Sequence, residues 1–175
     1  MKRFADLTRQ ERIRKAMSLR RKDLVLVLEN LSEDQNIAAI LRSAEAFGVG
    51  KVYIVHPEGK KPAIARQSAT GAHKWVNIEF YNSIIGCLKN LKKDGFYIIG
   101  ALVDPDANIL WDEDFSGKVA IVVGSESQGM SEEAQRLVAK NIYLPMLGLT
   151  ESLNVSVAAG IFLYEAIRQK EKGQL

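Results

Sequence analysis

The sequence of 175 residues contains one cysteine, two histidines and no long apolar run. A single cysteine, Cys87, excludes an intrachain disulfide and any metal site built from several cysteines, and it favours a reducing compartment. No apolar run approaches the roughly 18–20 residues that a membrane span requires. The first residues also lack the apolar core of a secretory signal. We therefore expect a cytoplasmic protein with no metal site and no membrane contact.

The charge of the chain is small but unevenly distributed. Residues 1–22 hold nine Lys and Arg against one Asp and one Glu, a net charge of +7, so residues 23–175 carry −4. A basic segment joined to a mildly acidic domain indicates a polyanionic partner that this segment contacts. The alternative is a solvated helix with a surplus of basic residues. We expect a basic helical extension over residues 1–22 and a main domain over residues 23–175.

Short apolar runs typical of strands buried on both faces alternate with segments of helical periodicity. The runs lie at residues 24–28, 52–55, 96–103, 119–123 and 142–144, with a further short strand at 76–80. The helical segments lie at residues 37–47, 83–94, 131–139 and about 151–172, and Gly48 and Gly95 are positioned to end the first two. This alternation predicts an α/β fold with a mostly parallel sheet and helices on both faces.

Three of the predicted strands are followed by unusual loops, and ligands bind beyond the carboxyl ends of strands in open parallel sheets. The first loop follows Leu28, the second spans Gly124–Gly129 and the third spans Pro145–Asn154. The second loop matches neither a phosphate loop nor a dinucleotide fingerprint and contains no lysine. The third loop has few ionisable groups and suits backbone contacts to a neutral ring. The loops favour an adenosine ligand without phosphates over ATP or NAD.

The same regions carry three motifs: Asn36–Ser43, Val122–Met130 and Leu144–Ala158. With them, residues 10–172 resemble the SpoU, or TrmH, family of RNA ribose 2′-O-methyltransferases in the SPOUT superfamily. The family branch that methylates the D-loop guanosine of tRNA, position 18, is the most similar. The features of that branch are the basic extension of residues 1–22 (the basic leader), the stretch Ser68–Val76 and the segment Tyr164–Gln169.

The resemblance implies a C-terminal trefoil knot, an exception to the rule that protein chains are unknotted. S-adenosylmethionine is expected in this knot, held mainly by backbone groups. Gly124, Leu144 and Leu153 match the family's cofactor contacts, and Leu102 is a weaker match. The resemblance also implies a homodimer with each active site near the subunit interface, and tRNA rather than DNA as the nucleic acid partner.

Arg42 matches the family's catalytic arginine. Because a guanidinium is effectively always protonated, we interpret Arg42 as a fixed cation that grips an RNA phosphate and stabilises the forming alkoxide. Water or a phosphate would then take the proton. The remaining matches would orient Arg42 and shape the ribose pocket; they are Asn36, Glu126, Ser152 and Asn154. Their structural alternatives are helix caps for the two asparagines and a solvated loop acid for Glu126.

Five arginines are assigned to tRNA binding: Arg9, Arg12, Arg20, Arg21 and Arg168. A last-turn cation such as Arg168 alternatively complements the dipole of its own helix. Trp75, beside His73 and Lys74, is interpreted as a core residue rather than as a platform for base stacking. Cys87 is interpreted as buried and inert.

Other functions stay open at this point. Within the enzyme class, the target could be another tRNA position, such as the wobble nucleotide, or ribosomal RNA. Members of the branch that methylates the D-loop usually extend beyond the last helix, so a weaker tRNA affinity or a different RNA is also open here. An RNA-binding pseudoenzyme would be expected to have lost Arg42 or the loops of Gly124 and Asn154, and all are present. The basic leader argues against a small-molecule methyltransferase.

Overall fold

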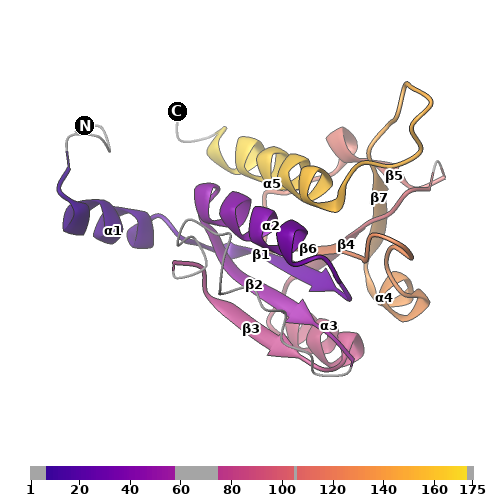
Figure 1. Cartoon of the computed structure of the whole chain (residues 1–175), viewed down its shortest axis with the longest axis horizontal. Helices are drawn as coiled ribbons and strands as arrows, with labels where there is room; N and C mark the ends of the chain where they lie inside the picture. Colours follow the sequence, from indigo (N-terminus) through magenta and orange to yellow (C-terminus); the bar gives the residue numbers. More distant parts are fainter. Residues whose placement is uncertain (1–6, 58–74, 105, 173–175) are drawn as a thin grey trace.

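The computed structural model describes residues 7–57, 75–104 and 106–172. In this part of the chain a seven-stranded sheet has the order β3-β2-β1-β6-β4-β7-β5 (Figure 1). Every strand pairing in it is parallel, which confirms the predicted α/β class. The strands are β1 (Arg21–Glu29), β2 (Val49–Val55), β3 (Ile78–Tyr81), β4 (Tyr97–Ala101), β5 (Asn108–Ile109), β6 (Val119–Val123) and β7 (Lys140–Tyr143).

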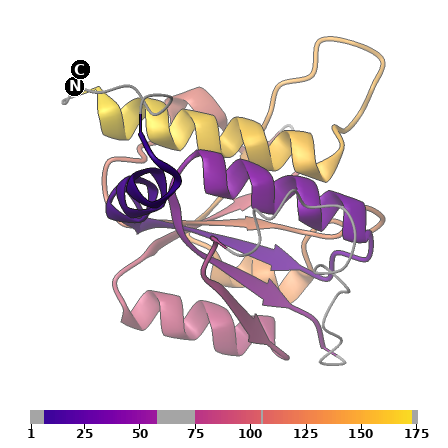
Figure 2. The same ribbon diagram turned by 60° about the vertical axis from the view of Figure 1, so that its left-hand side comes forward.

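Helices cover both faces of the sheet. Helices α2 (Asp34–Ala46) and α5 (Val155–Glu171) lie side by side on one face (Figure 2), and α3 (Ile84–Lys93) and α4 (Glu132–Leu137) pack on the other. Helix α1 (Arg9–Ser18) lies apart from both layers, before β1, and contains no buried residue. None of the described helices is long and apolar enough to cross a membrane.

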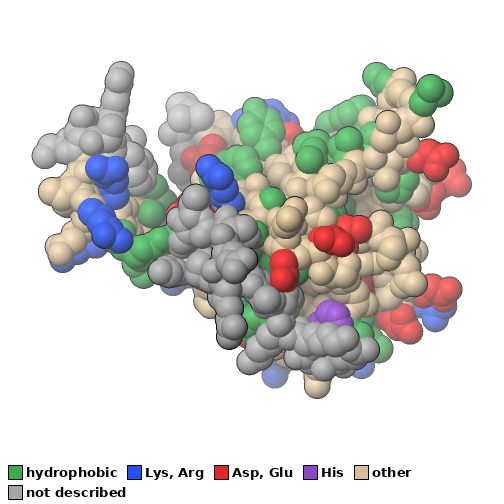
Figure 3. Space-filling view, viewed as in Figure 1, with side chains coloured by type: hydrophobic (Ala, Val, Ile, Leu, Met, Phe, Trp, Pro, Cys, Tyr) green, Lys and Arg blue, Asp and Glu red, His purple; other side chains and the backbone are tan. Residues whose placement is uncertain are grey.

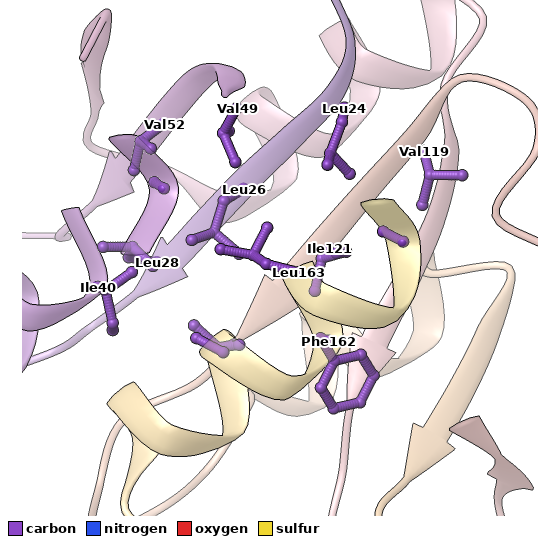
Figure 4. Packing of buried hydrophobic residues seen from close by; sticks show 14 of the residues in the cluster. Leu24, Leu26, Leu28, Ile40, Val49, Val52, Val119, Ile121, Phe162 and Leu163 are labelled. Carbon is purple, nitrogen blue, oxygen red and sulfur yellow. The ribbon is translucent and has the colours of Figure 1, made fainter. Parts of the chain in front are cut away.

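The core explains why the first apolar run is continuous. Leu24, Leu26 and Leu28 of β1 face the α2–α5 layer, whereas Val25 and Val27 face the α3–α4 layer. Successive strand residues point to opposite faces, so a strand covered on both sides needs apolar residues at every position. In Figure 4, Leu26 and Ile121 of the sheet face Leu163 of α5. Cys87 is also fully buried, and burial raises the pKa of its thiol to about 12, as expected of an inert residue.

Several boundaries differ from those predicted. Strand β1 begins at Arg21 rather than at residue 24, and within the described part of the basic extension the helix spans Arg9–Ser18. Strand β5 and the short 3₁₀ helix η3 (Leu110–Asp112) were not predicted, because two or three residues are too few to carry a periodic signal. Gly48 and Gly95 end α2 and α3 with φ values of 65° and 81°, as predicted. The C-terminal knot stays a prediction, because strand order and pairing do not define how a chain is threaded.

A buried ion pair ties the end of α5 to the start of β1. The Lys170 side chain is 1% exposed and donates hydrogen bonds to Asp23 Oδ2 at 2.9 Å and to the Gly117 carbonyl. Arg21 also donates to Asp23, with Nε 3.2 Å from Oδ1. Burial alone would raise the pKa of Asp23, but the hydrogen bonds from Arg21 and Lys170 outweigh it and leave the pKa lowered. Asp23 therefore supplies the counter-charge for a lysine that solvent does not reach.

Asp23→Asn should lower the free energy of unfolding by about 3 kcal/mol, because it leaves the buried ammonium without its counter-charge. Urea denaturation followed by circular dichroism measures the loss. The matched control is Glu132→Gln in the exposed Arg136–Glu132 pair, where the change should stay below about 1 kcal/mol. Equal losses in the two variants would contradict a special role for the buried pair.

Candidate active site

A cavity of about 490 Å³ lies beyond the carboxyl ends of β4, β6 and β7, against the start of α5. The loops that carry the second and third motifs form most of its wall. All four residues predicted to hold a cofactor line it, namely Leu102, Gly124, Leu144 and Leu153. Glu126, Ser152 and Asn154 line the same cavity. The structure therefore brings together seven of the predicted cofactor and catalytic positions, and the role of each stays a prediction.

The loop after β6 folds tightly back on itself. Ser125 and Gly129 exchange two backbone hydrogen bonds of 2.9 Å each, and Gly129 turns the chain with a φ of 67°. A Cβ on Gly124 would lie 2.0 Å from the carbonyl carbon of Gly129 and 2.1 Å from the nitrogen of Met130. Because both neighbours are backbone atoms, no side chain fits at Gly124. The wall of the cavity is therefore peptide backbone at this point.

The base of this loop is held by a residue that sequence reasoning missed. The Glu29 side chain is buried at the end of β1 and accepts hydrogen bonds from Ser131 N at 3.0 Å and Ser131 Oγ at 2.5 Å. The same hydroxyl accepts a bond from Ala134 N and caps α4. The one signal in the sequence was an acidic residue directly after the apolar run of β1. Glu29 thus fixes where the loop after β6 ends.

Three of the predicted site residues form a hydrogen-bonded chain that joins the three motifs. Asn36 Nδ2 donates to Glu126 Oε1 at 2.8 Å, and Asn154 Nδ2 donates to Asn36 Oδ1 at 3.0 Å. Asn154 also caps α5 by accepting a bond from Ser156 N at 2.9 Å. The N-cap of α2 is Glu33, so the interpretation of Asn36 as a helix cap is wrong. The chain links α2, the loop after β6 and the start of α5.

Glu126 gives the cavity its charge. Burial alone would raise the pKa of Glu126, but hydrogen bonds from Asn36 and from backbone N–H groups, including that of Ser32, outweigh it and leave the pKa lowered. It is the one ionisable side chain among the described residues that line the cavity. An ionised carboxylate in a cavity lined by no lysine or arginine repels phosphate groups. It attracts a ligand that carries positive charge.

Arg42 lies outside this network. It is exposed on α2, and among the described residues no side chain pairs with it. Arg42 lies six positions after Asn36, a rotation of about 240° around the helix, so the two side chains leave α2 on different sides. On the neighbouring helix α5, Val157, Ile161 and Tyr164 are exposed on one face. Arg42 therefore lies on the outer surface of the α2–α5 layer and not in the cavity of its own chain.

The arginines assigned to RNA binding fall into two groups. Arg9 and Arg12 are exposed on α1, and Arg12 makes only a local hydrogen bond among the described residues, from its Nε to the Leu7 carbonyl at 2.8 Å. The other three have partners within the protein and contribute to the fold whether or not they contact RNA. Their partners are the Glu45 side chain and the Glu45 and Trp75 carbonyls for Arg20, Asp23 and Glu171 for Arg21, and Glu165 for Arg168.

The interpretation of Trp75 as a core residue is wrong. Trp75 is 41% exposed, and the neighbouring Val76 takes the core position instead. His73 and Lys74 lie outside the described residues, as does most of the stretch Ser68–Val76 that contributed to the resemblance.

A wholly parallel sheet with a ligand-sized cavity beyond its carboxyl edge is typical of α/β enzymes that bind a small molecule there. The model of the SpoU rRNA Methylase family matches residues 23–164. The chain belongs to this family, which confirms the resemblance that its three motifs carry.

Similar proteins extend over nearly the whole chain. The tRNA (guanosine(18)-2′-O)-methyltransferase of Aquifex aeolicus is 39% identical over 164 residues, which cover 94% of this chain and 78% of the relative. The crystal structure of the A. aeolicus TrmH/SpoU tRNA modifying enzyme superposes with a TM-score of 0.87 at 37% identity, covering 94% of this chain and 85% of that one. The SpoU methyltransferase AviRb from Streptomyces viridochromogenes, solved with AdoMet, shares the fold, with a TM-score of 0.76 at 24% identity over 88% of this chain and 60% of that one.

Proposed function

We propose that this protein transfers a methyl group from S-adenosylmethionine to the ribose 2′-hydroxyl of the D-loop guanosine of tRNA, position 18. The observation that carries the proposal is the cavity at the carboxyl edge of the sheet, where the three motifs meet through Asn36, Glu126 and Asn154. Membership of the family and the activity named for the A. aeolicus relative support the reaction and the substrate. With tRNA as substrate, we expect the enzyme in the cytoplasm.

The residues of the cavity fit S-adenosylmethionine. The cavity has a volume of about 490 Å³, which is typical of a small-molecule site. The backbone at Gly124 allows a close approach, and the carboxylate of Glu126 suits a ligand with a sulfonium and an ammonium group. Leu102, Leu144 and Leu153 would contact the ligand from the other walls. When bound, S-adenosylmethionine supplies an electrophilic methyl group.

The protein's own contribution would be orientation and charge. Arg42 would hold an RNA phosphate through its planar guanidinium and stabilise the negative charge that develops on the 2′-oxygen, while water or a phosphate accepts the proton. The chain of Asn154, Asn36 and Glu126 would fix the wall against which the ribose lies, with Ser152 beside it. Alignment of the hydroxyl with the methyl group would supply much of the rate.

We further expect a homodimer with each active site near the subunit interface. The exposed apolar residues of α5 are joined by Leu147 and Leu149 in the loop before it, both fully exposed. Figure 3 shows several groups of hydrophobic side chains along the upper side of this view. Several large exposed apolar side chains on one side of a protein are typical of an interface. Because Arg42 is exposed on α2 and does not line the cavity of its own chain, a second copy would have to bring an arginine and a cavity together.

The proposed reaction is tested with labelled S-adenosylmethionine and unmodified tRNA transcripts. The D-loop guanosine is either intact or replaced by another nucleotide. We expect label in the intact transcript and none in the replaced one. Label that persists after replacement would refute the assigned position and direct the search to other tRNA or ribosomal RNA sites. Absence of label despite measurable cofactor binding would refute the tRNA reaction.

A further inference from the structure

A second cavity, of about 300 Å³, lies between α1 and the main domain. One side of α1 forms one wall and the edge of the domain forms the other. The residues that line it are Arg12, Ile13, Ala16, Met17, Arg20, Glu45 and Trp75. Since α1 is ten residues long and has no buried residue, the described chain leaves apolar surface uncovered on both walls. A ligand that contacts both walls would also hold α1 against the domain.

This cavity lies at the opposite edge of the sheet from the candidate active site. Arg20 directly precedes β1, Glu45 lies in the last turn of α2, and Trp75 precedes β3, so all three mark the amino-terminal ends of parallel strands. Figure 1 shows α1 at one end of the molecule and the start of α5 toward the other. At about 3.3 Å per residue, the length of β1 alone separates the two edges by roughly 30 Å. One small molecule cannot occupy both cavities.

The wall of this cavity that belongs to the main domain combines charged side chains with an aromatic ring. The Arg20 Nε is buried and has no hydrogen-bond partner, although the terminal nitrogens of this guanidinium bind the carbonyls of Glu45 and Trp75 at 3.1 and 2.9 Å. The Arg20 side chain is 14% exposed and the Glu45 side chain 31% exposed, so a ligand in the cavity reaches the carboxylate more readily than the guanidinium. The Glu45 carboxylate pairs with Arg20 at 3.3 Å and offers further acceptor positions. Beside both lies the half-exposed indole of Trp75.

We propose that this cavity binds an unstacked base of the RNA substrate, at a nucleotide distant from the one that is methylated. The inference rests on the proposed RNA substrate and adds a second contact point to it. A base has a flat face that stacks on an indole and an edge that carries both donors and acceptors. A phosphate alone is disfavoured because Glu45 already neutralises Arg20. An apolar side chain would leave the free acceptor positions of Glu45 without a donor.

The test compares three substitutions at the two tryptophans of the protein. Trp75→Ala should raise the Kd and the KM for tRNA by about 5- to 100-fold, the range expected for loss of one stacked base. The kcat and the Kd for S-adenosylmethionine should change less than about twofold, because the active site is untouched. Trp75→Phe should restore most of the affinity. The control is Trp111→Ala, since Trp111 is 61% exposed and lines neither cavity. This variant should behave as the parent.

A second readout does not depend on methyl transfer. In Trp111→Phe, Trp75 is the remaining tryptophan of the sequence, so its fluorescence reports on this cavity alone. Stacking on a base should quench that fluorescence when tRNA is added. Quenching without methylation would uphold this inference while refuting the proposed reaction. Methylation with no quenching and an unchanged KM in Trp75→Ala would overturn the inference. A changed oligomeric state of Trp75→Ala in light scattering would assign the cavity to a protein partner and overturn it as well.

Discussion

Replacing Arg42 by alanine should reduce the rate of methyl transfer by at least about 10²-fold, the loss typical of removing one group that stabilises charge in the transition state. Binding of S-adenosylmethionine should stay within about twofold of the parent, because Arg42 does not line the cavity. Arg42→Lys should recover little, since an ammonium lacks the planar pair of donors that a phosphate accepts. Single-turnover methylation and calorimetric titration of the cofactor measure the two effects separately.

The matched control is Arg136→Ala, which removes another exposed arginine from a helix, α4, that packs on the other face of the sheet. Its turnover and cofactor binding should equal those of the parent. Turnover retained in Arg42→Ala would refute the role assigned to this arginine. A parallel loss of cofactor binding would show instead that Arg42 supports the cavity and does not act on the RNA.

The sequence motif identifies Arg42 as a candidate catalytic residue, but it does not predict where its side chain lies in the structure. The exposed position of Arg42 explains this difference. Its motif supplies one side of the network through Asn36, but Arg42 leaves α2 on another side. A periodic pattern tells which helix residues face the core, and it does not tell which exposed residue meets a ligand or a second copy. The positions of Asn36, Glu126 and Asn154 were easier to predict, because each follows or opens an element at the carboxyl edge of a parallel sheet.

The features that could not be predicted from the sequence depend on contacts between residues far apart in the chain. Glu29 and Ser131 are 102 positions apart, and neither belongs to a repeat or a spaced motif that would pair them. The cavity between α1 and the domain is built from an isolated helix, the end of α2 and the residue Trp75. Trp75 was placed in the core because a tryptophan beside an apolar strand usually packs inward. In the structure Val76 is 7% exposed and belongs to the core, whereas Trp75 is 41% exposed.

Gly124→Ala should abolish measurable binding of S-adenosylmethionine. The added Cβ would lie 2.0 Å from the backbone of Gly129, and a peptide cannot move aside as the end of a flexible side chain can. The loop from Gly124 to Met130 would have to open, although Ser131 is fixed at its end by Glu29. Displacement would therefore fall on Ser125 and Glu126, which line the cavity. Calorimetric titration with S-adenosylmethionine measures the loss, and thermal unfolding shows whether the variant is folded.

Two further glycines give a graded comparison. Gly117→Ala places its Cβ in open space, with no heavy atom within 4 Å, and should leave binding and stability unchanged. Gly129→Ala meets no clash either, but it must adopt a φ of 67°, which costs roughly 1–2 kcal/mol for a residue with a side chain. We expect its cofactor affinity to fall between those of the other two variants. If Gly124→Ala remained folded and bound cofactor as well as Gly117→Ala, the loop would not form the wall of the cofactor site. A loss of affinity that increases in the order Gly117, Gly129, Gly124 would mean that the backbone path of this loop is needed for cofactor binding.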